Sequence, residues 1–135
     1  MNSMPLPVVS ALTASILIVM QMVLMMSVVL SRRKNRQSLA DGGRPDLLRA
    51  IRRHGNFAEN AAIFVAGFTL LELLGGSRSE LEIMCAIFVA GRMSHVIGLS
   101  LAKSVNAFRQ LGVASTAFVG IALGVRLVSM ALGLL

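Results

Sequence analysis

The sequence predicts an all-α, integral membrane four-helix bundle that occupies residues 1–135 as a single domain. Of the 135 residues, 56% are hydrophobic and only 14% are charged, which is too apolar for an ordinary soluble domain of this length. The apolar residues form four runs, each long enough to cross a hydrocarbon core of about 30 Å as a helix. These runs are residues 8–30, 57–74, 81–101 and 111–135.

The first run contains no charged residue and ends in the cluster Arg32-Arg33-Lys34-Asn35-Arg36. Cations directly after an apolar run are typical of a stop-transfer segment and suit anionic lipid headgroups. No basic segment precedes the run, and the run is longer than the apolar part of a signal peptide. We therefore expect it to be retained as the first span.

Turn and cap residues place the next two helices. Asp41-Gly42-Gly43 predicts a turn, and Pro45 and Asp46 suit the first turn of a helix. The second helix is therefore expected to begin near Pro45 and to continue to about residue 74. Gly75-Gly76 should end it, and Ser79 with Glu82 has the spacing of a capping box that opens the third helix.

The distribution of basic residues predicts the orientation in the membrane. Of the 13 Lys and Arg residues, eight lie in the range 32–53, and Lys103 and Arg109 lie in the third connection. With four spans, the first and third connections fall on the same side. The positive-inside rule places both connections in the cytoplasm and both termini outside. This explains the net charge of +7, and we expect no nucleic-acid partner.

A polar stripe enters the second helix from its basic end. At about 100° per residue, Arg49, Arg52, Asn56 and Glu59 share an arc of roughly 80°, and His54 points to the opposite side. An arginine, an amide and a carboxylate on one face are typical of a surface that recognises a small charged molecule.

The topology brings further cations to the depth of Glu59. Spans two and three run in opposite directions, so Arg92 and His95 should lie in the same half of the membrane, with Arg109 at its entrance. One interpretation is a structural ion pair between Glu59 and Arg92. The other is a binding site for an anion, because several cations converge on one carboxylate. Glu72, Glu82 and Arg126 should form rim pairs at the other end, and no set of metal ligands is evident.

The sequence also resembles a known family, the membrane-associated proteins in eicosanoid and glutathione metabolism, MAPEG, in its compact bacterial branch. The resemblance lies in Asp41-Gly42-Gly43, Arg52-x-His54-x-Asn56-x-x-Glu59, Gly91-Arg92-x-x-His95 and Arg109-x-x-Gly112. It implies a homotrimer in the inner membrane that binds glutathione as co-substrate near the cytoplasmic side. It also implies an activity like that of the microsomal glutathione transferases, which conjugate or reduce lipophilic electrophiles.

The resemblance assigns a role to each of six residues. Asn56 and Glu59 would hold the polar groups of glutathione, with the acid on the α-amino end. Arg52 and His95 would contact the carboxylates and backbone of glutathione. Arg92 would pair with Glu59. The catalytic residue would be Arg109, which stabilises the thiolate and thereby creates the nucleophile.

Three departures from the family pattern keep alternatives open. Catalytic relatives carry a tyrosine where this chain has Leu99, a serine is common at Gln110, and some members have an arginine at Gly55. A non-catalytic lipid-binding or scaffold protein of the same family is therefore the second hypothesis. A four-helix multidrug exporter is the third, but its acidic residue in the first span is absent here.

Overall fold

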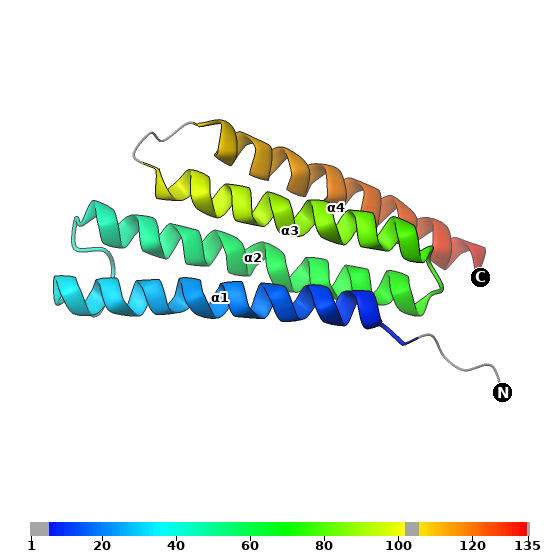
Figure 1. Cartoon of the computed structure of the whole chain (residues 1–135), viewed down its shortest axis with the longest axis horizontal. Helices are drawn as coiled ribbons and strands as arrows, with labels where there is room; N and C mark the ends of the chain where they lie inside the picture. Colours follow the sequence, from blue (N-terminus) through cyan, green and yellow to red (C-terminus); the bar gives the residue numbers. More distant parts are fainter. Residues whose placement is uncertain (1–5, 102–105, 135) are drawn as a thin grey trace.

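The computed structural model describes residues 6–101 and 106–134, which form four helices that run alternately up and down (Figure 1). These are α1 (Val8–Asn35), α2 (Pro45–Leu73), α3 (Arg78–Ser100) and α4 (Ala107–Gly133). The predicted all-α bundle is confirmed. The connection from α1 to α2, the end of α3 and the start of α4 lie at the same end of the bundle, which we call the basic end (Figure 1).

α2 is the least apolar of the four helices. Within the described residues, α1, α3 and α4 are long and apolar enough to cross a membrane, and α2 is not among them. Its apolar part is interrupted by Asn56, Glu59, Asn60 and Glu72. α2 packs against each of the other three helices, whereas α1 and α4 make no contact with each other in the described part of the chain. α3 also contacts all three other helices, so α2 and α3 form the middle of the bundle and α1 and α4 flank them.

The predicted helix boundaries of α2 are confirmed. Gly42 and Gly43 have φ angles of +55° and +70°, which suit glycine, and α2 begins at Pro45. At the other end Gly75 has φ +80°, and the Gly76 N–H donates to the Leu71 carbonyl at 2.9 Å. This pattern is a Schellman motif, which satisfies carbonyls that the end of a helix leaves unpaired.

The capping box predicted for α3 is wrong. α3 already begins at Arg78, with Ser77 as its N-cap, so Ser79 lies inside the helix instead of preceding it. The Ser79 hydroxyl lies 3.1 Å from that of Ser77, and Glu82 pairs with Arg78 at 2.8 Å. The i, i+4 ion pair thus takes the carboxylate that the capping box required.

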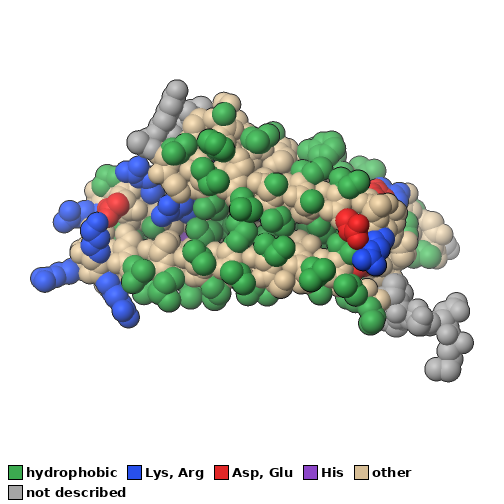
Figure 2. Space-filling model, viewed as in Figure 1, with side chains coloured by type: hydrophobic (Ala, Val, Ile, Leu, Met, Phe, Trp, Pro, Cys, Tyr) green, Lys and Arg blue, Asp and Glu red, His purple; other side chains and the backbone are tan. Residues whose placement is uncertain are grey.

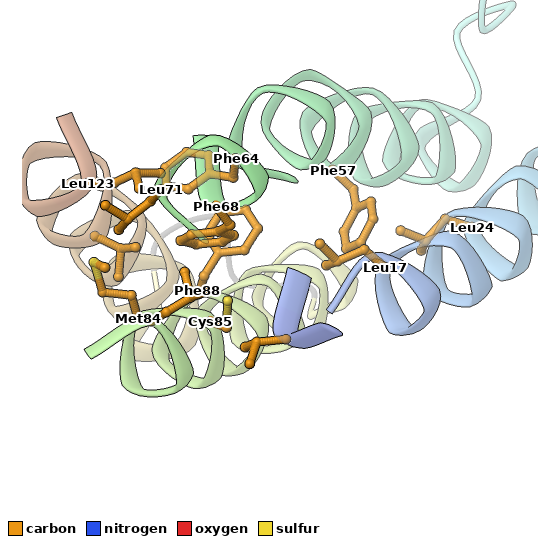
Figure 3. Packing of buried hydrophobic residues seen from close by; sticks show 13 residues of the cluster. Leu17, Leu24, Phe57, Phe64, Phe68, Leu71, Met84, Cys85, Phe88 and Leu123 are labelled. Atoms are coloured by element: carbon orange, nitrogen blue, oxygen red, sulfur yellow. The ribbon is translucent and has the colours of Figure 1, made fainter. Parts of the chain in front are cut away.

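The core is built from phenylalanines of α2 and α3 (Figure 3). The rings of Phe64 and Phe88 stack with centroids 4.1 Å apart, and Phe68 meets Phe88 edge-on at 5.8 Å. Nearer the basic end, Phe57 of α2 lies beside Leu17 of α1 (Figure 3). Association of helices in a membrane depends on such close packing, because lipid offers no hydrophobic driving force between them.

The charges at the other end of the bundle have structural partners. Arg126 pairs with Glu80 at 2.7 Å, and Arg78 pairs with Glu82. Glu72 caps α1: its carboxylate accepts hydrogen bonds from the N–H groups of Val9 and Ser10 at 2.9 and 2.8 Å. Rim pairs were expected of Glu72, Glu82 and Arg126. Glu82 and Arg126 form them, whereas Glu72 forms none among the described residues and instead satisfies N–H groups that the first turn of a helix leaves unpaired.

Candidate functional site

A polar cavity of about 700 Å³ opens at the basic end, and we call it the basic-end cavity. Figure 2 shows Lys and Arg side chains gathered at the same end of the bundle. α2, α3 and α4 all contribute to its wall. Its lining residues are Ile51, Arg52, Gly55, Asn56, Glu59, His95, Leu99, Arg109 and Val113. Five of the six residues that the sequence singles out therefore meet in one cavity.

α2 supplies the wall with the polar stripe. Arg52, Asn56 and Glu59 face the cavity from one side of the helix, with Arg52 and Glu59 exposed and Asn56 half-buried. His54 lies on the opposite side, where its Nε2 is 2.7 Å from the Gln21 amide nitrogen of α1. The division of α2 into a cavity-facing stripe and a packing face is as the helical period predicts.

α3 contributes two buried side chains, a histidine that lines the cavity and an arginine that lies behind its wall. His95 is 5% exposed and lines the cavity. Arg92 is 2% exposed and lies behind the cavity wall: its Nη1 donates to Asn56 Oδ1 at 3.2 Å. Its Nη2 donates to the Gly112 carbonyl at 3.0 Å and to the Thr116 hydroxyl. Arg92 thus connects α2, α3 and α4.

The expected ion pair between Arg92 and Glu59 is not formed among the described residues. The guanidinium group of Arg92 points toward α4, where a carbonyl and a hydroxyl accept its hydrogen bonds. The Glu59 side chain is exposed toward the cavity. The carboxylate is therefore left facing the space that a ligand would occupy.

Two glycines bring α3 and α4 close enough to place the remaining site residues. A Cβ atom on Gly112 would lie 2.6 Å from the Cβ of His95, and one on Gly98 would lie 2.5 Å from the backbone nitrogen of Arg109. Neither position has room for a larger residue without a shift of backbone. The two glycines therefore allow α3 and α4 to approach closely at His95 and Arg109.

Arg109 lies in the first turn of α4. The side chain of Asn106 caps this helix: its Oδ1 accepts from the Arg109 N–H at 3.0 Å, and its Nδ2 donates to the Gly98 carbonyl at 2.8 Å. The cap holds the start of α4 against the end of α3. A guanidinium group at the positive end of a helix dipole favours an anion beside it.

The cavity combines an excess of cations with one acid. Arg52 and Arg109 carry positive charge, and His95 and Asn56 offer nitrogen atoms for hydrogen bonds, opposite the carboxylate of Glu59. No group of three or more metal-ligating side chains occurs in the described ranges 6–101 and 106–134. The arrangement suits a small molecule that carries carboxylates and one ammonium group.

The apolar part of the cavity and the hydrogen-bond partners of Arg92 were not predicted from the sequence. Ile51, Leu99 and Val113 line the cavity but belong to no polar motif. Thr116 was missed because a hydroxyl on a membrane helix commonly bonds to its own backbone. It does so here, donating to the Gly112 carbonyl at 2.7 Å, and it accepts from Arg92 as well.

Comparison with known proteins identifies the family of the chain. The profile of the MAPEG family matches residues 10–129. The inner membrane protein YecN of Escherichia coli K12 is 33% identical over 90 residues, which cover 67% of this chain and 69% of YecN; the YecN of strain O6:H1 gives the same figures. No solved structure matches the chain significantly. The extent of the profile match and the identity to an inner membrane protein lead to one conclusion: this chain is a membrane protein of the MAPEG family.

Proposed function

We propose that this protein binds glutathione in the basic-end cavity and uses it as co-substrate to conjugate or reduce lipophilic electrophiles. The observation that carries the proposal is the convergence of Arg52, Asn56, Glu59, His95 and Arg109 on one cavity. These residues come from three helices and are up to 57 positions apart in the chain, counted from 52 to 109. A purely structural role does not explain why they face a shared space.

The chemistry of glutathione matches the lining of the cavity. Glutathione carries two carboxylates, an α-ammonium group, two amides and a thiol. The Glu59 carboxylate would accept hydrogen bonds from the ammonium group. Arg52, Asn56 and His95 would donate hydrogen bonds to carboxylate or amide oxygens. A cavity of about 700 Å³ is within the usual range for ligands of this size.

Arg109 would act on the thiol. A guanidinium group beside the sulfur stabilises the thiolate and lowers the thiol pKa, and each unit of pKa corresponds to about 1.4 kcal/mol. In conjugation, the thiolate electron pair forms a bond to an electrophilic carbon, and the displaced pair leaves with a leaving group or takes up a proton. The apolar side chains of Ile51, Leu99 and Val113 would face the electrophile.

The proposal includes the placement in the membrane and the assembly. The basic end would face the cytoplasm, because eight of the 13 Lys and Arg residues lie in the range 32–53. The homotrimer that the family resemblance implies would place the cavity between subunits. The exposed side chains of Arg52 and Glu59 support this, because a neighbouring subunit would bury them further.

Binding of glutathione to the protein in nanodiscs tests the proposal. We expect saturable binding to the wild type, and a loss of at least tenfold in affinity for Glu59→Ala and Arg109→Ala. Arg49→Ala is the matched control, because Arg49 lies at the same end of α2 but does not line the cavity. Absence of binding to the wild type would refute the ligand, and binding with no consumption of thiol across a panel of electrophiles would refute the activity.

A second candidate function is non-catalytic binding of a lipid, and Leu99 favours it. Leu99 lines the cavity at the position where catalytic relatives are expected to carry a tyrosine hydroxyl. A native mass spectrum separates the two functions. A lipid that is retained by the protein and not displaced by glutathione would support this alternative.

A further inference from the structure

Arg92 carries a buried charge that lies next to the cavity without lining it. Its side chain is 2% exposed, and its three acceptors are the Asn56 amide oxygen, the Gly112 carbonyl and the Thr116 hydroxyl. No carboxylate lies within ion-pair distance of it among the described residues. Of these three acceptor residues, Asn56 is the one that lines the basic-end cavity.

This bond determines which end of the Asn56 amide faces the cavity. A guanidinium group has only hydrogen-bond donors, so it is the amide oxygen of Asn56 that must face Arg92. The amide nitrogen then points away from Arg92, with two N–H groups. Asn60 does not compete for the amide, because its side chain donates to the backbone carbonyl of Asn56 at 2.9 Å.

We infer that Arg92 is a positioning residue that acts through Asn56 and makes the Asn56 wall of the cavity a hydrogen-bond donor. Glu59 is three residues further along the same face of α2 and is an acceptor. The wall therefore presents a donor and an acceptor in a fixed order, which selects a ligand with a carbonyl or carboxylate oxygen beside an ammonium or amide N–H. Without Arg92 the amide can turn over and offer its oxygen instead. The choice of glutathione as the probe rests on the proposed function.

Asn56→Asp separates this role from a structural one. Aspartate has nearly the same shape, keeps an oxygen on Arg92 and supplies the missing counter-charge, so the thermal midpoint of unfolding should stay the same or rise. The second oxygen replaces the N–H donor at the cavity wall. We expect the affinity for glutathione to fall at least tenfold. Wild-type affinity in this variant would overturn the inference.

A double-mutant cycle tests whether Arg92 acts through Asn56. Arg92→Met and Asn56→Ala should each weaken glutathione binding about tenfold or more, and the double variant should bind within threefold of Asn56→Ala. Thr116→Val is the matched control, because it removes a bond to the other guanidinium nitrogen and leaves the bond to Asn56. It should bind within threefold of the wild type. Additive losses in the cycle would overturn the inference.

A second measurement needs no ligand and keeps the inference testable if the wild type does not bind glutathione, which would refute the proposed function alone. In protein labelled with ¹⁵N-asparagine, the carboxamide signals missing from Asn56→Ala belong to Asn56. Arg92→Met should shift or broaden these signals, and Thr116→Val should leave them nearly unchanged. Carboxamide signals of Asn56 that do not respond to Arg92→Met would overturn the inference.

Discussion

Gly98→Ala tests whether the seam between α3 and α4 determines the position of Arg109. The added Cβ would lie 2.5 Å from the backbone nitrogen of Arg109 and 2.9 Å from its Cα. An ordinary van der Waals contact begins at 3.4 Å, so the shortfall is 3.4 minus 2.5, or 0.9 Å. The opposing atoms are backbone and cannot rotate away. The first turn of α4 must therefore retreat by about this distance.

The displacement has two consequences of known size. Overpacking costs about 1–3 kcal/mol, and the better helix propensity of alanine returns about 1 kcal/mol, so the net loss of stability is about 0–2 kcal/mol. A shift of about 1 Å in a catalytic group costs on the order of 100-fold in rate. If Arg109 acts on the thiol as proposed, turnover should therefore decrease much more than stability.

The assay compares Gly98→Ala with Gly124→Ala in nanodiscs. Gly98 is in α3 and Gly124 is in α4, where an added Cβ meets no atom within 4 Å, so this control should keep the thermal midpoint and any glutathione turnover of the wild type. Gly98→Ala should lose most of its turnover with a modest decrease in the midpoint. A Gly98→Ala protein with wild-type turnover would refute the reasoning that the close contact of Gly98 with Arg109 determines the position of Arg109.

Three further predictions address separate features. Glu72→Gln should lower the unfolding free energy by about 1–3 kcal/mol in denaturant titrations, because a carboxylate that accepts two N–H bonds and the Ser10 hydroxyl becomes an amide with one oxygen. Leu99→Tyr should raise glutathione turnover about tenfold if the cavity is catalytic, since a hydroxyl there can donate to a developing anion; an unchanged rate would favour lipid binding. The hydrogen bond from Asn35 holds the pKa of Asp46 below its usual value, so its stabilisation is present above about pH 4 and is lost as the pH falls through the folded-state pKa. Asp46→Asn should reduce the acid-side decrease in the thermal midpoint, with a small effect because Asp46 is exposed.

The fold was predictable because it depends on signals that are local in the chain. Four apolar runs and the turn glycines determine four antiparallel helices, and Gly43 and Gly75 adopt the positive φ angles that only glycine adopts easily. The misplaced capping box of α3 shows the limit of such signals. A serine with a glutamate three residues later fits a cap, but Arg78 offers the same Glu82 a competing ion pair.

Most of the candidate site was predictable because depth in a membrane is nearly one-dimensional. The antiparallel order places Glu59, His95 and Arg109 at similar heights, and the helical period turns Arg52 and Glu59 to one face. The partners of Arg92 were not predictable. They depend on the rotation of α3 about its axis relative to α4, which is determined by packing along the whole helix and by no short motif.

The polarity of α2 and the position of the cavity have one physical cause. Asn56 and Glu59, two of the residues that reduce the hydropathy of this helix, line the basic-end cavity. Polar groups at membrane depth are tolerated where they face protein or a wet cavity, and α2 packs against all three other helices. A helix in this central place can hold a ligand-binding stripe that would be costly on α1 or α4, which leave most of their apolar surface exposed. The polar stripe therefore lies on one of the two helices that contact all three others.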